Sequence, residues 1–322
     1  MRRKLTILVL VAVAVLAAAG VAEAANGGFT PVTPHSPNAH HINTAYDVIL
    51  GFTGAIFLLV EGALVTFIVK YRRGKRPRTA DGAQVHGNTR LELIWTVVPV
   101  LILAAIGVVV FLELPKISNA PAASNPIHIT VEGHQFYWQF DYPNGARTIG
   151  ALYVPVDRVV DLKVVSADVI HSWWIPALGG KIQAIPGRTN HTWFEANDPG
   201  TYTGQCAELC GVYHAAMSAR VVAESTAAYL HDTSVSVATG NLGRAEFTGV
   251  CATCHGMTGQ GGYGPNIANN SLLTQKAGLS ALITKGLGLM PPVAISWTPV
   301  QYDALAAYVK SHVFKGASAS GG

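Results

Sequence analysis

Two apolar segments constrain the fold of this chain more than any other feature. Residues 46–69 and 93–114 are each apolar and long enough to cross a bilayer, which takes about 20 residues of helix. The loop of residues 70–92 between them is rich in lysine and arginine, so the positive-inside rule places it in the cytoplasm. We therefore expect a two-helix transmembrane hairpin, with both remaining parts of the chain on the outer side.

The composition agrees with a membrane protein. Half of the 322 residues are hydrophobic and only 12% are charged, which is too apolar for a chain without membrane segments. The net charge of +4 is modest and indicates no nucleic-acid partner. The four cysteines fall into two motifs, at 206–210 and 251–254, which leaves none for a separate structural disulfide.

The first 24 residues have the pattern of a secretory signal peptide. Basic residues at positions 2–4 precede an apolar run, and the Ala22-Glu-Ala24 pattern, with small residues at its two ends, predicts cleavage after Ala24. An uncleaved membrane anchor is the alternative, although the apolar run is shorter than a span needs. Residues 25–45, with prolines and no lysine or arginine, are expected to form an external segment.

The pattern changes after the second apolar segment. Residues 118–222 contain short alternating runs separated by Gly, Pro, Asn and Asp, which predicts a small antiparallel β-sandwich or barrel. Residues 223–240 are rich in Ala, Ser, Thr and Gly and predict a flexible linker. Residues 316–322 are expected to be a disordered tail.

One stretch of twelve residues, 206–217, combines two thiols, an imidazole and a thioether. Cys206, Cys210, His214 and Met217 are soft or borderline ligands, a set typical of copper electron-transfer sites rather than of structural zinc. A disulfide between Cys206 and Cys210 is the alternative in an exported chain. Its three-residue gap would make a tight loop.

This stretch resembles subunit II of the haem-copper cytochrome c oxidases, whose signature is C-x-E-x-C-x-x-x-H-x-x-M. His171 lies where the remaining histidine ligand of that family lies. The resemblance implies a cupredoxin-like domain that holds a dinuclear copper centre, CuA. The resemblance implies that the thiolates of Cys206 and Cys210 bridge the two copper ions. It also implies that His171 and Met217 complete one ion, and that His214 and the Glu208 backbone carbonyl complete the other.

Two carboxylates have further roles implied by the resemblance. The Glu208 side chain would reach a magnesium or manganese ion at the interface with subunit I. Residues 86–99 also resemble the family, which implies that Glu92 stands at the mouth of a proton pathway into subunit I. The alternative is that Glu92 only favours the dipole at a helix start. Glu61, in the first span, has no assigned role.

Two positions depart from the family pattern. Phe136 stands where the family has a tryptophan that admits electrons from soluble cytochrome c, with Trp138 nearby as a second candidate aromatic. Gln183 stands where many members have an aspartate that helps to dock a basic cytochrome c. We therefore expect a changed docking route for the electron donor.

A second cofactor motif follows the predicted linker. Cys251, Cys254 and His255 form a c-type haem attachment motif, in which two thiols add to the haem vinyls and the histidine takes one axial position. Met290 offers a sulfur for the other axial position. Met257 is the rival, but only two residues from His255 it cannot reach the opposite haem face.

Residues 241–315 resemble a small class I cytochrome c, which implies an all-α domain. In that family a proline carbonyl orients the axial histidine, and this role falls to Pro265. Thr298 as a cap and Pro299 in the first turn predict a closing helix that runs through Val309.

Together the resemblances imply a multi-domain subunit II of a caa-type, proton-pumping cytochrome c oxidase, with a fused cytochrome c that has taken over docking. Implied partners are subunit I with haem a and CuB, subunit III, membrane lipid, and an external donor such as a cytochrome c or cytochrome bc1 complex. The implied location is the bacterial inner (plasma) membrane, with the copper and haem domains on the periplasmic side. Two alternatives remain: a quinol oxidase subunit, against which the intact copper ligands count, and a free-standing anchored carrier of electrons or copper.

Overall fold

The computed structural model describes residues 31–71, 84, 86–121, 125–237, 239–295 and 297–315. The predicted signal peptide, residues 1–24, and the predicted tail, residues 316–322, lie outside these residues. The chain divides into two compact units. One contains most of the two long helices, and the other contains residues 31–40 and everything from residue 117 onward.

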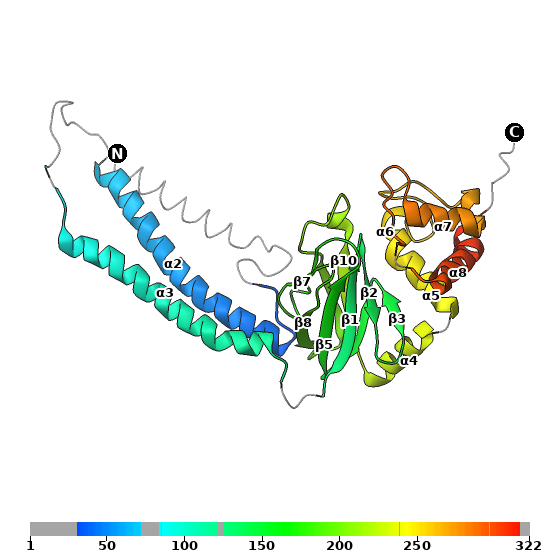
Figure 1. Ribbon diagram of the computed structural model, residues 1–322. Helices are drawn as coiled ribbons and strands as arrows, with labels where there is room; N and C mark the ends of the chain where they lie inside the picture. The colour runs from blue at the N-terminus through cyan, green and yellow to red at the C-terminus, as the bar shows by residue number, and fades with distance from the viewer. Residues whose placement is uncertain are drawn as a thin grey trace, which may run out of the picture. The chain divides into compact units, whose positions relative to one another are not determined.

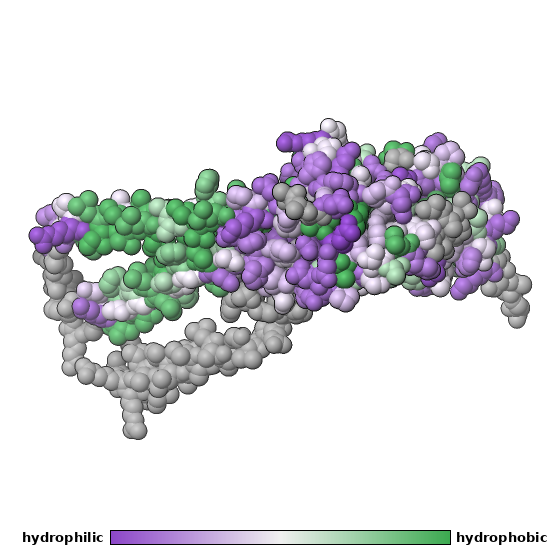
Figure 2. All heavy atoms as spheres, turned by 90° about the horizontal axis from the view of Figure 1, so that it is seen from below, coloured by the Kyte–Doolittle hydropathy of each residue, from purple (hydrophilic) through white to green (hydrophobic). Residues whose placement is uncertain are grey.

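The two long helices are α2 (Pro37–Tyr71) and α3 (Thr89–Ser118). Their most apolar windows have mean hydropathies of 2.3 and 2.8, and none of either window is buried. Figure 1 shows them side by side, and Figure 2 shows that apolar side chains cover them. At 1.5 Å per residue each exceeds the hydrocarbon core of about 30 Å. The predicted hairpin is confirmed.

Both helices extend beyond the predicted bounds of 46–69 and 93–114, because polar residues continue them past the apolar segments. Helix α2 begins at Pro37, so part of the predicted external segment 25–45 is helical. At this end of the hairpin, Glu113 accepts from His41 Nδ1 at 2.7 Å and from Lys116 Nζ at 3.0 Å. Glu113 and Lys116 therefore lie near the end of α3, whereas Glu61 lies within α2.

Ten strands form the β domain that follows. They make a five-stranded sheet in the order β3-β2-β1-β5-β8, a three-stranded sheet β4-β10-β9 and a pair β6-β7. Their bounds are β1 Ile127–His134, β2 Tyr137–Asp141, β3 Arg147–Ile149, β4 Leu152–Pro155, β5 Val159–Ser166, β6 His171–Trp173, β7 Ile182–Ala184, β8 Asn190–Glu195, β9 Gly200–Gln205 and β10 Ser218–Glu224.

The sheets are mixed, which corrects the prediction of a wholly antiparallel sandwich. Strand β1 pairs in parallel with β5, and β4 pairs in parallel with β10, while the other pairs are antiparallel. Alternating hydrophobicity indicates which face of a strand is buried but carries no information on strand direction. The sandwich itself is confirmed: Val131, Phe140, Leu162 and Val221 are fully buried between its layers.

The last part of the chain is helical. Its core contains Phe247, Leu279, Ile283, Leu305 and Val309, all buried. A capping box between Thr298 and Gln301 begins the closing helix, as predicted. The elements are α4 Thr226–Val237, α5 Thr239–Glu246, η2 Phe247–Cys251, α6 Ala252–His255, η3 Ser271–Thr274, α7 Lys276–Lys285, α8 Pro299–Tyr308 and η4 Val309–Val313.

The predicted linker, residues 223–240, contains helix α4 instead of an extended flexible segment. Tyr229 and Thr233 lie one turn apart on this helix and are both buried, at 8% and 0% exposure. The Tyr229 ring packs against Tyr142 of the β domain, with centroids 6.3 Å apart. This packing orders a segment whose small polar composition gave no helical periodicity.

Candidate metal centre and haem crevice

The candidate copper ligands come from two places in the β domain. His171 begins β6, and the others lie on the loop that joins β9 to β10. This loop is closed where the Cys206 N–H donates to the Met217 carbonyl at 2.9 Å. It is tied to β6 where the Ala207 N–H donates to the Ser172 carbonyl at 2.9 Å. The loop therefore has little freedom to separate its ligands from His171.

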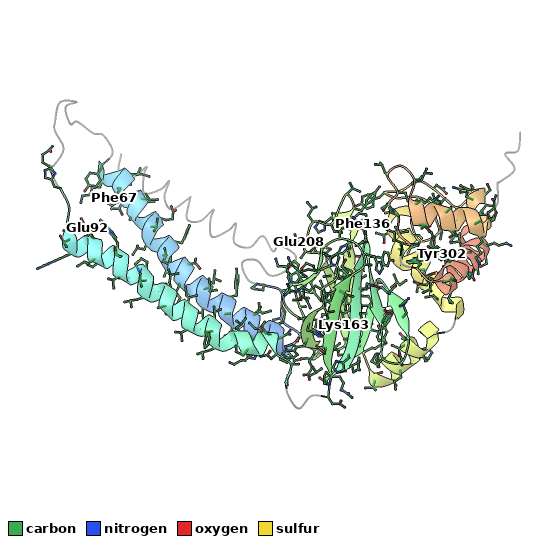
Figure 3. All side chains as sticks on the ribbon, viewed as in Figure 1. Phe67, Glu92, Phe136, Lys163, Glu208 and Tyr302 are labelled. Atoms are coloured by element: carbon green, nitrogen blue, oxygen red, sulfur yellow. The ribbon has the colours of Figure 1, made fainter. Side chains whose placement is uncertain are left out.

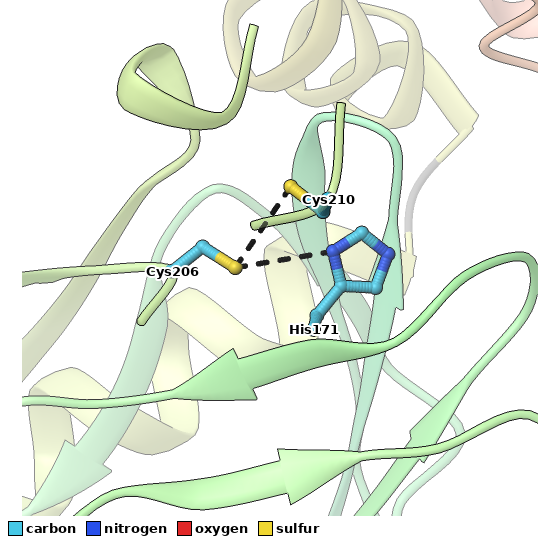
Figure 4. Close-up of side chains that lie close together, drawn as sticks. All are labelled: His171, Cys206 and Cys210. Atoms are coloured by element: carbon cyan, nitrogen blue, oxygen red, sulfur yellow. Dashed lines mark hydrogen bonds between the residues drawn. The ribbon is translucent and has the colours of Figure 1, made fainter. Parts of the chain in front are cut away.

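The sulfur and nitrogen atoms of these residues converge. Cys206 Sγ lies 3.9 Å from Cys210 Sγ and 4.0 Å from His171 Nδ1 (Figure 4). Cys210 Sγ lies 3.5 Å from His214 Nδ1 and 3.8 Å from Met217 Sδ. Both cysteines are free thiols, so the alternative of a disulfide, which needs about 2.05 Å between sulfurs, is not what the structure contains.

The carbonyl oxygen predicted as a ligand is also at this site. The Cys206 thiol donates to the Glu208 carbonyl at 3.2 Å. Cys206, Cys210, His171 and Met217 are all buried, with exposures of 4% or less. His214 and Glu208 are partly exposed. A set of two thiols, two imidazoles, a thioether and a carbonyl fits copper, which prefers soft and borderline ligands.

Asp168 fixes the orientation of His171, a role that the sequence analysis missed. Its Oδ1 lies 2.7 Å from His171 Nε2, which directs Nδ1 toward Cys206. The backbone N–H groups of Gln135 and Val169 donate to the same carboxylate, each at 2.6 Å. Burial raises the pKa of Asp168, but these hydrogen bonds outweigh it, so the pKa lies below its usual value.

The two thiols differ in acidity. Burial raises the pKa of Cys206, but hydrogen bonds from His171 and from the Ser172 N–H lower it to a net value of about 7. Burial and the neighbouring Cys206 thiolate raise the pKa of Cys210 to about 12. Copper binds thiolates, so metal binding must displace a proton from Cys210 and is favoured by rising pH.

Replacing Asp168 with asparagine is expected to weaken copper binding about 10- to 100-fold, the usual cost of losing the partner that orients a metal-bound histidine. A competition titration with a copper chelator measures this. Asp161→Asn is the matched control, because Asp161 bonds the exposed His128 at 2.9 Å, away from the copper loop. Equal copper affinity in the two variants would contradict an orienting role for Asp168.

The Glu208 carbonyl accepts from Cys206, but the Glu208 side chain has another partner. Gln183 Nε2 donates to Glu208 Oε2 at 3.2 Å in an exposed hydrogen bond. Figure 3 labels Glu208 in the copper domain. Gln183, which departs from the family pattern, therefore contacts Glu208, the residue whose carboxylate is predicted to bind a magnesium or manganese ion.

The haem motif lines an apolar cavity of about 410 Å³ in the helical domain. Cys251, Cys254, His255, Pro265 and Met290 all lie on its wall. The rest of the wall is mainly apolar side chains: Phe247, Leu279, Ile283, Leu305 and Val309 among them. These residues fit a haem c, because the thiols, the axial ligands and the apolar surface all face one space.

The two residues predicted as axial ligands, His255 and Met290, both line this cavity. His255 Nδ1 lies 2.8 Å from the Pro265 carbonyl, which leaves Nε2 free to bind a haem iron. A Cβ on Gly264 would lie 2.8 Å from the His255 ring, so only glycine allows this approach. Met290 lines the cavity, whereas Met257 is 61% exposed and does not.

The two aromatic residues named as candidate electron-entry points, Phe136 and Trp138, differ in exposure: Phe136 is partly buried and Trp138 lies in the core. Phe136 packs edge-on against Tyr213, with centroids 5.5 Å apart. Trp138 has no exposed surface and packs against the rings of His171 and Trp173. A direct contact between Trp138 and an external donor is therefore excluded in this fold. Alternation along β2 places it inside.

Glu92 lies in the first turn of α3 (Figure 3). Its Oε1 accepts from the Asn88 N–H at 3.1 Å, while Asn88 Oδ1 accepts from the Leu91 N–H at 3.1 Å. This reciprocal pair caps the helix, as the alternative of a helix-start carboxylate predicts.

Known protein families match the membrane helices, the copper domain and the helical domain of this chain. Residues 24–112 and 146–225 match the families described as cytochrome c oxidase subunit II, transmembrane domain and periplasmic domain. Residues 238–309 match the family described as cytochrome c oxidase, cbb3-type, subunit III.

Two relatives are similar over most of their own length. The chain is 37% identical over 257 residues to cytochrome c oxidase subunit 2 of Alkalihalophilus pseudofirmus, covering 74% of each chain. It is 32% identical over 249 residues to the subunit 2 of Synechocystis sp., covering 63% of this chain and 74% of that one. A crystal structure of the periplasmic domain of subunit II of cytochrome oxidase of Bradyrhizobium japonicum is 33% identical, with a TM-score of 0.35, covering 37% of this chain and 97% of that one.

Proposed function

The chain belongs to the family of cytochrome c oxidase subunit II and carries a cytochrome c domain, and we propose that it relays electrons from a covalently bound haem to a dinuclear copper centre. It is a membrane protein with its copper domain on the periplasmic side. The observation that supports the relay most is the convergence of the candidate copper ligands on one buried loop, in the same compact unit as the haem crevice. From there the electrons pass to subunit I, which reduces oxygen to water.

The residues of the copper loop have distinct tasks. Cys206, Cys210, His171, Met217, His214 and the Glu208 carbonyl would hold the copper pair, which would supply one-electron redox chemistry with little rearrangement. Burial of Cys206, Cys210, His171 and Met217 limits the access of water, and Asp168 keeps the His171 ring in place.

The haem crevice performs the preceding step of the relay. Cys251 and Cys254 would attach the haem covalently, and His255 and Met290 would hold its iron, which would supply one-electron redox chemistry. The Pro265 carbonyl holds the His255 tautomer that coordinates through Nε2. The apolar wall lowers the local dielectric constant and so takes part in setting the reduction potential.

Partners complete the assembly. Subunit I, with haem a and CuB, and subunit III are the expected membrane partners, and a cytochrome c or a cytochrome bc1 complex is the expected donor. We place a magnesium or manganese ion at the Glu208 carboxylate, shared with subunit I. Glu92 stands at the start of α3, where a proton pathway into subunit I would begin.

Removal of the haem domain tests the relay. A chain that ends after Glu224, assembled into the oxidase, is expected to lose most of its oxygen consumption with soluble cytochrome c as the donor. The haem domain is the proposed electron acceptor, and the family's tryptophan is absent at Phe136. Undiminished turnover would mean that the Phe136 surface accepts electrons directly, and would contradict the proposed order of transfer.

A further inference from the structure

The cytochrome domain contacts the copper domain through Tyr137, which is buried although it lies on the face of β2 that points away from the sandwich core. Trp138 and Phe140 of β2 face the sandwich core. Because side chains alternate between the two faces of a strand, Tyr137, which precedes Trp138 in β2, faces outward. Tyr137 is nevertheless only 2% exposed. Its outward face must therefore be covered by another element, and that element is the cytochrome domain.

The tyrosine hydroxyl is bonded twice by the cytochrome domain. Trp297 Nε1 donates to the Tyr137 hydroxyl at 2.8 Å, and this hydroxyl donates to the Val293 carbonyl at 3.2 Å. Val293 and Trp297 follow Met290 in the same segment. The His134 ring stacks on the other side of Tyr137, with centroids 4.6 Å apart and planes 3° from parallel. Tyr137 is thus held on both sides.

Polar groups extend the contact toward β3. Arg147 Nη1 donates to Gln301 Oε1 of α8 at 3.2 Å, and Asp141 holds the same guanidinium at 2.5 and 3.1 Å. Glu246, at the end of α5, is fully buried close to these groups. Burial raises the pKa of Glu246 to about 9, so at neutral pH it is protonated and adds no buried charge to the contact.

The two backbones also meet directly. A Cβ on Gly249 would lie 2.5 Å from Cγ2 of Ile149, and a Cβ on Gly150 would lie 3.2 Å from the Gly249 Cα. Glycines therefore allow η2, which ends at Cys251, to lie against the end of β3. Such close approach is specific to one arrangement of the two domains.

The haem crevice opens onto the copper loop in this arrangement. Tyr213 lines the haem cavity together with Cys254 and Met290. Phe136 and Tyr213 also line a smaller adjoining cavity of about 50 Å³, with Cys251 and His255 on its other side. Tyr213 belongs to the copper loop and directly precedes the candidate ligand His214, so the copper loop itself forms part of the cavity wall.

We propose that Phe136, Tyr137 and Tyr213 form a docking surface for the chain's own cytochrome domain, with Tyr137 as the positioning residue and Tyr213 as the contact next to the haem. This inference rests on the proposed function and names the surface it uses. Each transfer oxidises one ferrous haem to ferric and reduces the mixed-valence copper pair to two Cu(I) ions, with no bond or proton exchanged. A soluble donor then has to reduce the haem domain, because Phe136 is partly buried and shares a cavity with residues of that domain.

The test compares Tyr137→Phe, Trp297→Phe and the double variant in the intact oxidase. Hydrogen exchange of peptides covering residues 134–150 and 290–301 reports how often the domains separate. Trp297→Phe removes one hydrogen bond of the Tyr137 hydroxyl, and Tyr137→Phe removes that bond and the bond to the Val293 carbonyl. Protection is therefore expected to fall about two- to tenfold in Trp297→Phe and at least as much in Tyr137→Phe. The double variant should add little to Tyr137→Phe, because that change already removes the bond to Trp297. Tyr202→Phe is the matched control, since it loses a hydroxyl bond to the Asp198 carbonyl, 2.8 Å, outside this surface.

Photoreduction of the haem provides the second measurement. Haem-to-copper transfer is expected to slow in Tyr213→Ala and to recover in Tyr213→Phe, with unchanged haem and copper spectra. Wild-type protection in Tyr137→Phe and Trp297→Phe, or a wild-type transfer rate in Tyr213→Ala, would overturn the docking proposal. Absence of haem-to-copper transfer in the wild-type oxidase would instead overturn the proposed function, while the exchange data would still decide the docking surface.

Discussion

Replacement of Cys210 with serine is expected to abolish the dinuclear copper centre and stop electron delivery to subunit I. Cys210 Sγ lies within 3.9 Å of Cys206 Sγ, His214 Nδ1 and Met217 Sδ, so it is the atom that the two halves of the site share. A serine hydroxyl is a hard, weakly acidic ligand that does not replace a bridging thiolate. Low-temperature electron paramagnetic resonance of the purified oxidase measures the loss of the mixed-valence signal.

The control for this variant is Ser218→Ala, one residue beyond Met217 on the exposed side of β10. It should keep the copper signal, and both variants should keep the haem absorption, because the haem crevice is formed by other residues. A mixed-valence copper signal that survives in Cys210→Ser would show that this thiol does not bridge the ions. The assignment of the ligand set would then be wrong.

Met290→Leu is expected to convert the haem from a six-coordinate to a five-coordinate or water-ligated state. Leucine keeps the apolar volume of the side chain but removes the sulfur that Met290 brings to the cavity lined also by His255. Loss of a thioether ligand lowers the reduction potential, since methionine ligation raises it. The absorption and spin state of the oxidised haem, with a redox titration, measure the change.

Met257→Leu is the matched control, because it makes the same substitution at a methionine that is 61% exposed and away from the cavity wall. It should leave the spin state and the reduction potential as in the wild type. The account would be contradicted if Met257→Leu changed the spin state and Met290→Leu did not.

The sequence was most informative where the chemistry is local. Cys206, Cys210, His214 and Met217 lie on one loop, so their spacing alone indicated a metal site. The haem motif is local for the same reason. His171 comes from a distant strand, and only the resemblance to a family could assign it. The transmembrane spans were also predictable, because a bilayer requires a long apolar run whatever its neighbours are.

Tertiary contacts decided what the sequence could not. Asp168 stands three residues before His171, which was a usable signal, but its two backbone donors come together only in the fold. The hydrogen bond between Tyr137 and Trp297 joins residues 160 positions apart. Helix α4 depends on the packing of Tyr229 against the β domain, which small polar residues around it do not reveal.

The contact of the Phe136 surface with the cytochrome domain gives a physical reason for the two departures from the family pattern. A surface that contacts the chain's own cytochrome domain does not have to recognise a soluble, basic partner. Phe136 can then pack against Tyr213, and Gln183 can donate to Glu208, without a loss of donor binding. The same reasoning moves donor recognition to the surface of the cytochrome domain.

The most direct test of the central claim is a stepwise anaerobic reduction of the purified oxidase, followed by optical and electron paramagnetic resonance spectra of the same sample. The account predicts one covalently bound, low-spin haem c and one mixed-valence dicopper centre per chain. The resonance signals of the ferric haem and of the copper pair should both disappear on full reduction. A covalent haem without the dicopper signal would contradict it. Cys206 and Cys210 would then belong to another kind of site, and the chain would not relay electrons through a copper pair.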